Sequence, residues 1–139
     1  MIFDTNVVSE PMQAKPDEKV MRWLNQLDLL SCFITAITAA ELLAGVERLP
    51  MGRKREHLNA TVGHVVDNKF AGRVLPFDLV AAKHFAVAVE KLHRQGLNGM
   101  HVDAMIAGIA LMHNMPIASR DIRPYKAAGV RVVNPWTDE

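Results

Sequence analysis

One cysteine stands in the whole chain of 139 residues, so no internal disulfide can form. Disulfides are rare in the reducing cytoplasm and common outside it, and a chain without one fits a cytoplasmic location. Cys32 lies in the apolar run SCFIT, a setting that favours a buried, inert thiol over a nucleophile. The sequence therefore predicts a cytoplasmic protein whose one thiol is structural.

The sequence also lacks a long hydrophobic run. No stretch approaches the ~20 apolar residues that a membrane-spanning helix needs. A charged residue, Asp4, comes too early for a signal peptide to precede it. With 50% hydrophobic residues, a chain of this size can fill one sizeable core. We expect a single domain over residues 1–139, with no membrane partner, in which Asp4 belongs to the fold.

Aromatic residues are scarce, at 6% of the chain, and the formal net charge is only +1. We expect Trp23, Phe85 and Trp136 to lie in the core or an interface rather than to stack on single-stranded bases. The basic residues nevertheless form two clusters, comprising Arg48, Arg53, Lys54 and Arg55, and Arg120, Arg123, Lys126 and Arg131. Such clusters attract polyanions, although most charge runs are simply solvated faces.

Strand and helix patterns alternate along the chain. Short apolar runs predict strands at 1–3, 32–35, 73–77, 116–119 and 130–133. Helical patterns cover 17–29, 38–49, 53–69, 78–95 and 102–114, with Asp78 as an N-cap. This alternation favours an α/β fold with a central parallel sheet covered on both faces. Ligands bind such sheets beyond the carboxyl ends of the strands, which makes Asp4 and Asp121 candidate site residues.

Two further carboxylates stand in apolar helices. Glu41 lies in ITAAELLAG and Asp103 in HVDAMIAGIA, and neither has a basic residue three or four positions away. Both have ordinary structural explanations as well. Thr38 and Glu41 spell a capping box, and Asp103 suits the first turn of a helix. Asp4 and Asp121 similarly suit turns.

Taken together, the four carboxylates indicate a metal site under one condition. If Asp4 and Asp121 sit at strand ends, and Glu41 and Asp103 sit in the first turns of helices that follow neighbouring strands, all four converge on one edge of the sheet. Two carboxylates ~4 Å apart repel by about 4 kcal/mol at an effective dielectric of about 20. Such a cluster must hold protons or bind a cation, and oxygen ligands favour Mg²⁺ or Mn²⁺. The histidines are scattered, so no zinc-like spacing competes.

Several segments resemble one known family. MIFDTNVVSE, ITAAELLAG, HVDAMIAGIA and IASRD resemble, in this order, the acidic motifs of PIN domains, specifically those of VapC-type toxins of the FitB-like branch. AGRVLPFD and the closing VVNPW also resemble that branch, so the likeness covers essentially the whole chain. It implies a three-layer α/β/α PIN-like domain and a metal-dependent endoribonuclease that acts as the toxin of a toxin-antitoxin pair.

The resemblance also assigns roles to individual residues. Asp4 and Asp103 match the principal metal-binding acids of the family, and Glu41 and Asp121 match its second and fourth acidic positions. All four would be catalytic. Thr5 matches the polar residue that follows the first acid and supports it. A cation held by Asp4 and Asp103 would activate a water for in-line attack on an RNA phosphodiester, leaving a 5′-phosphate and a 3′-hydroxyl.

Partners are implied by the same resemblance. VapC-type toxins are usually homodimers and are restrained by a small VapB-like antitoxin, through which alone they reach operator DNA. A structured RNA such as tRNA fits the basic clusters as the substrate. Two alternatives stay open. One is a toxin-fold partner in a DNA-binding antitoxin complex with little nuclease turnover. The other is a hydrolase of small phosphoesters, against which the lack of a Gly-rich phosphate cradle argues.

Overall fold

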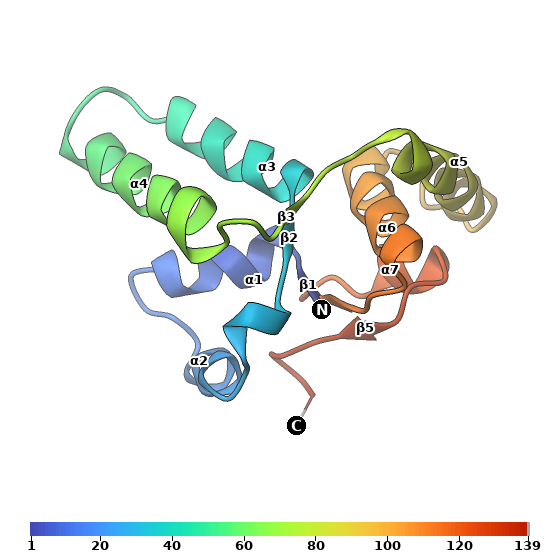
Figure 1. The fold of residues 1–139 in the computed structure, drawn as a ribbon, viewed down its shortest axis with the longest axis horizontal. Helices are drawn as coiled ribbons and strands as arrows, with labels where there is room; N and C mark the ends of the chain where they lie inside the picture. Colours follow the sequence, from blue (N-terminus) through green and yellow to red (C-terminus); the bar gives the residue numbers. More distant parts are fainter. Residues whose placement is uncertain (139) are drawn as a thin grey trace.

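The centre of the computed structural model, which describes residues 1–138, is a sheet of short parallel strands (Figure 1). Its strands are β1 Ile2–Phe3, β2 Ile34–Thr35, β3 Val74–Leu75, β4 Ile117–Ala118 and β5 Val132–Val133. One ladder has the order β1-β4-β5, and β2 pairs with β3. Two backbone hydrogen bonds join the ladders, from Phe3 N to Phe33 O at 2.8 Å and from Phe33 N to Met1 O at 2.9 Å.

The strand order is therefore β3-β2-β1-β4-β5, and it reverses at β1. From β1 the chain moves outward through β2 to β3, and later returns to the other side of β1 to form β4 and β5. In register, Ile2 lies opposite Ile117 and Phe3 lies opposite Ala118. Because the strands are parallel, the residues that follow β1 and β4 emerge at the same edge, where such sheets bind ligands.

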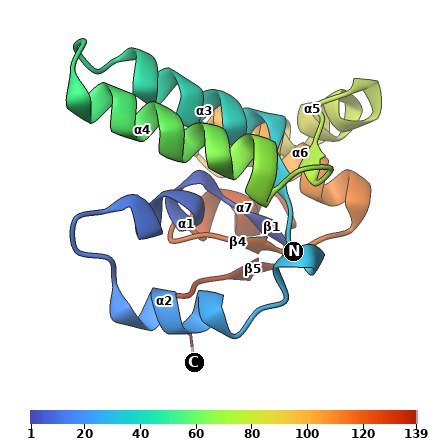
Figure 2. The same cartoon turned by 60° about the vertical axis from the view of Figure 1, so that its left-hand side comes forward.

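Helices cover both faces of this sheet. Figure 1 shows α1, α3 and α4 on one side of the strands and α5, α6 and α7 on the other. The helices are α1 Thr5–Ser9, α2 Glu18–Asn25, α3 Ala36–Glu47, α4 Arg53–His64, α5 Leu79–Arg94, α6 His101–His113 and α7 Arg123–Ala127. Two short 3₁₀ helices lie at Glu10–Met12 and Leu29–Ser31, and a π-helical turn over Val65–Lys69 continues α4. Figure 2 shows α3 and α4 side by side, with α1 beneath them.

The side chains of the strands alternate between two hydrophobic cores. Ile2 and Ile117 pack with residues of α5, α6 and α7. Their neighbours Phe3 and Ala118 point the other way, into a core shared with α1, α3 and α4. A strand buried on both faces is typical of a parallel sheet between helical layers. The predicted three-layer α/β/α fold with a central parallel sheet is confirmed.

Helices α5 and α6 pack unusually closely because residue 108 is glycine. A β-carbon at Gly108 would lie 2.8 Å from Ala81 O and 2.9 Å from Phe85 N, both backbone atoms of α5. Real side chains cannot approach that closely, so only glycine lets the two backbones meet. Within residues 1–138, no helix is long and apolar enough to cross a membrane.

The predicted elements are largely present, with three differences. All five strands form at the expected places, although each is shorter than predicted. The helix expected over 17–29 ends at Asn25, because Asp28 caps a separate turn at Leu29–Ser31. Helices α1 and α7 were not predicted, since five residues are too few to show a helical period.

Two local predictions can be settled. The Thr38–Glu41 capping box is wrong, because α3 begins at Ala36 and the hydroxyl of Thr35 accepts the hydrogen bond from Thr38 N at 3.1 Å. The N-cap at Asp78 is confirmed, since its carboxylate accepts from Ala81 N at 2.9 Å. Cys32 is buried as expected.

Candidate active site

Asp4 lies directly after β1, at the point where the strand order reverses. It is 5% exposed and acts as the N-cap of α1. Its Oδ1 accepts a hydrogen bond from Thr5 N at 2.8 Å, and its Oδ2 accepts one from Ser119 Oγ at 2.7 Å. Burial raises the pKa of Asp4, and these hydrogen bonds oppose the rise only in part. The strand therefore delivers a firmly held carboxylate to the sheet edge.

Asp103 approaches from the other helical layer. It is the third residue of α6 and is half-buried. The hydroxyl of Tyr125 donates a hydrogen bond to Asp103 Oδ1 at 3.3 Å. Burial, and next the nearby negative charge of Asp4, raise the pKa of Asp103 to about 6. The same pKa also responds to the charges of Asp121 and Glu41, so the structure brings all four predicted acids into one electrostatic neighbourhood.

Glu41 is placed by α3, in its second turn, and its carboxylate is exposed. Thr5 Oγ1 lies 2.6 Å from Glu41 Oε1 and 3.1 Å from Thr38 Oγ1. The hydroxyl of Thr5 carries one proton and the Glu41 carboxylate can only accept. Thr5 therefore donates to Glu41 and accepts from Thr38. Thr5 supports two acids at once, Asp4 through its backbone N–H and Glu41 through its side chain.

Asp121 is exposed and lies two residues beyond Ser119, at the end of β4. Its backbone N–H donates to Ser119 Oγ at 3.0 Å. Ser119 Oγ in turn donates to Asp4 and accepts from Asn6 Nδ2 at 3.2 Å. The buried Ser119 hydroxyl thus couples the positions of Asp4 and Asp121, and this role was not predicted from the sequence.

None of the four acids forms an ion pair with a basic side chain within residues 1–138. The nearest basic residue in sequence, Arg120, turns away from Asp121. Its guanidinium lies 3.5 Å from Glu10 Oε2 and 4.2 Å from the ring centroid of Trp136. No ion pair among the described residues therefore compensates the negative charge at the sheet edge.

The donor set fits a hard divalent cation. Across the part of the chain that the structure describes, no three Asp, Glu, His or Cys side chains lie close enough together to form a ready-made metal site. Mg²⁺ and Mn²⁺ need only one or two carboxylates and keep water or substrate oxygens in the other positions. Asp4 and Asp103 match that requirement.

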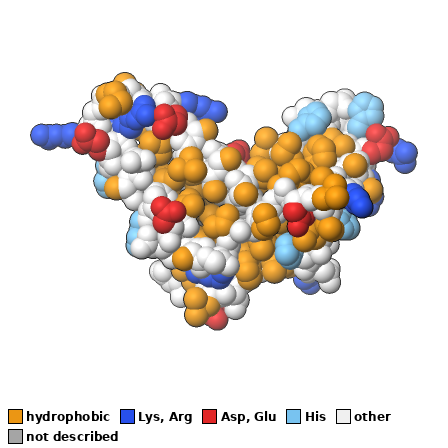
Figure 3. All heavy atoms as spheres, turned by 45° about the horizontal axis from the view of Figure 1, so that its top comes forward, with side chains coloured by type: hydrophobic (Ala, Val, Ile, Leu, Met, Phe, Trp, Pro, Cys, Tyr) orange, Lys and Arg blue, Asp and Glu red, His pale blue; other side chains and the backbone are white. Residues whose placement is uncertain are grey.

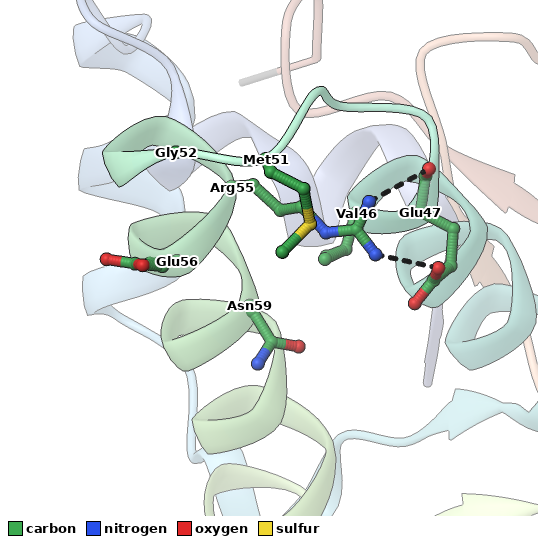
Figure 4. Close-up of a pocket in the computed structure, with 7 residues that line it drawn as sticks. All are labelled: Val46, Glu47, Met51, Gly52, Arg55, Glu56 and Asn59. Carbon is green, nitrogen blue, oxygen red and sulfur yellow. Dashed lines mark hydrogen bonds and ion pairs between the residues drawn. The ribbon is translucent and has the colours of Figure 1, made fainter.

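The two basic clusters differ in their surroundings. A pocket of about 230 Å³ lies between α3 and α4, and its lining residues are drawn in Figure 4. In it, Arg55 pairs with Glu47 at 2.8 Å. Arg55 also donates to Leu49 O at 2.9 Å, so it closes the α3–α4 turn. The other cluster is more open, since Arg123 and Lys126 line a groove of about 620 Å³ between α7 and the end of α5.

Comparison with known proteins assigns the chain to a family. A family model described as the PIN domain matches residues 1–130, and the chain belongs to this family.

Relatives of known name share almost the full length of the chain. It is 38% identical over 138 residues to Toxin FitB of Neisseria gonorrhoeae, with 99% of each chain covered. It is 36% identical over 136 residues to VapC ribonuclease Y4jK of Sinorhizobium fredii, covering 98% of this chain and 97% of the relative. A plasmid stability protein, StbB of Pseudomonas syringae pathovar tomato, is 38% identical over 136 residues, with 98% of each covered.

Solved structures agree with these relationships. The structure of FitAB bound to a DNA fragment superimposes with a TM-score of 0.93 at 38% identity, covering 99% of this chain and 96% of that one. A DNA-bound VapBC structure from Salmonella typhimurium gives a TM-score of 0.76 at 27% identity, with 96% of each chain covered. The resemblance to VapC and FitB toxins that the acidic motifs indicated is confirmed.

Proposed function

We propose that this protein is a metal-dependent endoribonuclease and the toxin of a toxin-antitoxin pair. One observation carries the proposal most directly. Asp4 and Asp103 meet at the point where the strand order reverses, and no basic side chain within residues 1–138 neutralises them. The relative named VapC ribonuclease supports the nuclease activity, and the relative named Toxin FitB supports the role as a toxin.

Asp4 and Asp103 would hold the cation in this proposal. A bound Mg²⁺ or Mn²⁺ would lower the pKa of a water and stabilise the negative charge that develops on the phosphate. Ser119 and the Thr5 amide fix the carboxylate of Asp4 before substrate arrives. Glu41 and Asp121 are the exposed acids at the mouth of the site, where they can orient water against the incoming phosphodiester.

The substrate we propose is RNA held by its backbone. Arg123 and Lys126 lie on α7, the helix that begins two residues after Asp121, and both are exposed. Basic side chains beside an acidic site attract phosphates at a distance from the acids themselves. Aromatic stacking contributes little, because Trp23, Phe85 and Trp136 pack against the hydrophobic clusters. A structured RNA such as tRNA fits this arrangement better than a single strand.

The partner we propose is a VapB-like antitoxin that carries the complex to operator DNA. The FitAB and VapBC structures named above are complexes bound to DNA, which supports this assignment. Figure 3 shows hydrophobic side chains gathered across the middle of one face. Exposed apolar residues of the described chain include Leu43 on α3, Leu79 and Val87 on α5, and Val102 on α6. A homodimer and an antitoxin would both bury surface of this kind.

The test is cleavage of a total RNA pool by the purified chain, free of antitoxin, in Mg²⁺ or Mn²⁺. We expect cuts that leave 5′-phosphates, and we expect Asp4→Asn and Asp103→Asn to abolish them. Asp67→Asn is the matched control, since Asp67 is an exposed acid on the Val65–Lys69 turn. Cleavage that persists in both site variants, or that continues in EDTA, would refute the proposal.

The DNA-bound FitAB complex favours one second candidate function. The protein would then serve mainly as the antitoxin's partner in a repressor, with little nuclease turnover. Operator binding by the complex that survives Asp103→Asn, while the free chain cuts no RNA under any metal condition, would favour this function.

A further inference from the structure

Tyr125 is the only tyrosine of the chain, and it reaches the candidate site from a segment that no acidic motif covers. It lies on the short helix α7, and its side chain is fully buried. The ring belongs to the core formed by α5, α6 and β4, with Ile106, Ala110 and Ala128 in the same cluster. Its backbone carbonyl accepts from Val130 N at 2.9 Å, which ties the end of α7 to the chain that follows.

The hydroxyl of Tyr125 faces the two acids that we propose as metal ligands. It donates to Asp103 Oδ1 at 3.3 Å and lies beside the carboxylate of Asp4. Burial, and next the charges of these two carboxylates, raise the pKa of Tyr125 well above its ordinary value. The phenol is therefore neutral and acts as a hydrogen-bond donor, not as a base.

The two acids depend on this hydroxyl to different extents. Asp4 has other donors, the Thr5 amide and the Ser119 hydroxyl. For Asp103, Tyr125 is the one hydrogen-bond donor found within residues 1–138. Since Tyr125 holds Oδ1, the Oδ2 atom of Asp103 is left for another partner. Without the hydroxyl, no hydrogen bond within residues 1–138 would fix the rotation of the Asp103 carboxylate.

Packing alone does not explain a tyrosine here. A phenylalanine would fill the same space, and a buried hydroxyl costs free energy unless it is hydrogen-bonded. Among the described residues, the hydroxyl finds its hydrogen-bond partner only among the site carboxylates. Groups that orient a metal-binding side chain typically change metal affinity by about 10–100-fold when removed.

We infer that Tyr125 is a positioning residue of the metal site: its hydroxyl orients the Asp103 carboxylate toward Asp4 so that the two can share one cation. The inference rests on the proposed metal-dependent function. It adds a residue that lies outside the four acidic motifs and that acts through Asp103 rather than on the RNA.

The first test is Mn²⁺ binding by the full chain, measured by calorimetry. We expect Tyr125→Phe to weaken Mn²⁺ affinity by about 10–100-fold. Ile109→Val is the matched control, because Ile109 is fully buried in the same core cluster, lies six residues after Asp103 on α6 and loses only one methyl group. Ile109→Val should bind Mn²⁺ with the affinity of the unmodified chain. That affinity should hold even if its urea midpoint of unfolding in EDTA is lower.

A double-variant cycle separates positioning from a general loss of structure. Because Tyr125 acts through Asp103, Tyr125→Phe should weaken Mn²⁺ binding no further in an Asp103→Asn background. Equal Mn²⁺ affinity of Tyr125→Phe and the unmodified chain would overturn the inference, as would an equal loss in both backgrounds. If the unmodified chain binds no Mn²⁺ at all, the proposed metal dependence is refuted, and this inference is refuted as well.

A spectroscopic test keeps the hydroxyl at position 125 in place. Incorporation of 3-fluorotyrosine gives a single ¹⁹F signal, because the chain has one tyrosine. We expect this signal to move as Mg²⁺ is added, with the same midpoint as the calorimetric titration, and to stay still in Asp103→Asn. A ¹⁹F chemical shift that does not change with Mg²⁺, while calorimetry detects binding, would overturn the inference.

Discussion

Replacing Asp103 with asparagine should make the metal-free protein more stable while it destroys the proposed activity. At neutral pH the Asp103 carboxylate is ionised although it is half-buried and close to other acids. That ionised form is disfavoured in the folded state, which is why the pKa rises from 3.8 to about 6. An amide of nearly the same shape removes the charge and keeps an oxygen that can accept from Tyr125.

The magnitude follows from the pKa. The difference between 3.8 and about 6 corresponds to about 3 kcal/mol of free energy of unfolding. Solvent reaches part of the side chain and screens it, so we expect a gain of about 1–2 kcal/mol at about pH 8. With a urea m-value of about 1.5 kcal/mol/M, that gain moves the unfolding midpoint upward by about 1 M.

The pH dependence of the stability gain tests whether the raised pKa of Asp103 is its cause. A carboxyl group whose pKa is raised on folding stabilises the protein at low pH, and that contribution is lost as the pH rises through about 6. The advantage of Asp103→Asn should therefore shrink to under about 1 kcal/mol at about pH 4, where the folded acid is already protonated. Urea titrations in EDTA at both pH values measure this difference.

The control for this experiment is Asp67→Asn, which removes an exposed carboxylate and should change stability by no more than about 0.5 kcal/mol. The reasoning is refuted if Asp103→Asn is less stable than the unmodified chain at about pH 8, or if its advantage is the same at both pH values.

Three further predictions concern the site and the packing around it. Ser119→Ala removes the donor to Asp4 Oδ2 and should weaken Mn²⁺ binding by about 10–100-fold, measured by calorimetry; unchanged affinity would contradict the coupling. Mn²⁺ affinity of the unmodified chain should rise as the pH rises through about 6, because the cation competes with the proton on Asp103; a flat profile would count against it as a ligand. Gly108→Ala should lower the free energy of unfolding by about 1–3 kcal/mol, since the new methyl group meets the backbone of α5 at 2.8 Å, whereas Gly45→Ala, with no atom within 4 Å, should not.

Much of the site was visible in the sequence because polar residues interrupt apolar runs. Asp4 and Asp121 follow predicted strands, and Glu41 and Asp103 stand alone in apolar helices. A parallel sheet brings its strand ends to one edge, so placing these acids together required only the fold class. One step of that reasoning was wrong. Asp103 does not follow a strand, because α6 comes directly after α5.

Other contacts of the site were indicated by the sequence only weakly or not at all. Ser119 is a polar residue at the end of a predicted strand, and that position alone could have marked it. Tyr125 gave no signal, because a tyrosine on a five-residue helix has no pattern to stand out from. Arg55 was grouped with the basic cluster, yet its ion pair with Glu47 depends on how α3 and α4 meet.

The sequence by itself determined the alternation of strands and helices, the family and the identity of the acids, since all of these depend on residue type and spacing along one chain. Only the tertiary structure decided which groups support the acids. Ser119 and Asp4 are 115 residues apart, and Thr5 and Glu41 are 36 apart. A hydrogen bond between such segments depends on register and side-chain direction to within an ångström, and local sequence does not specify either.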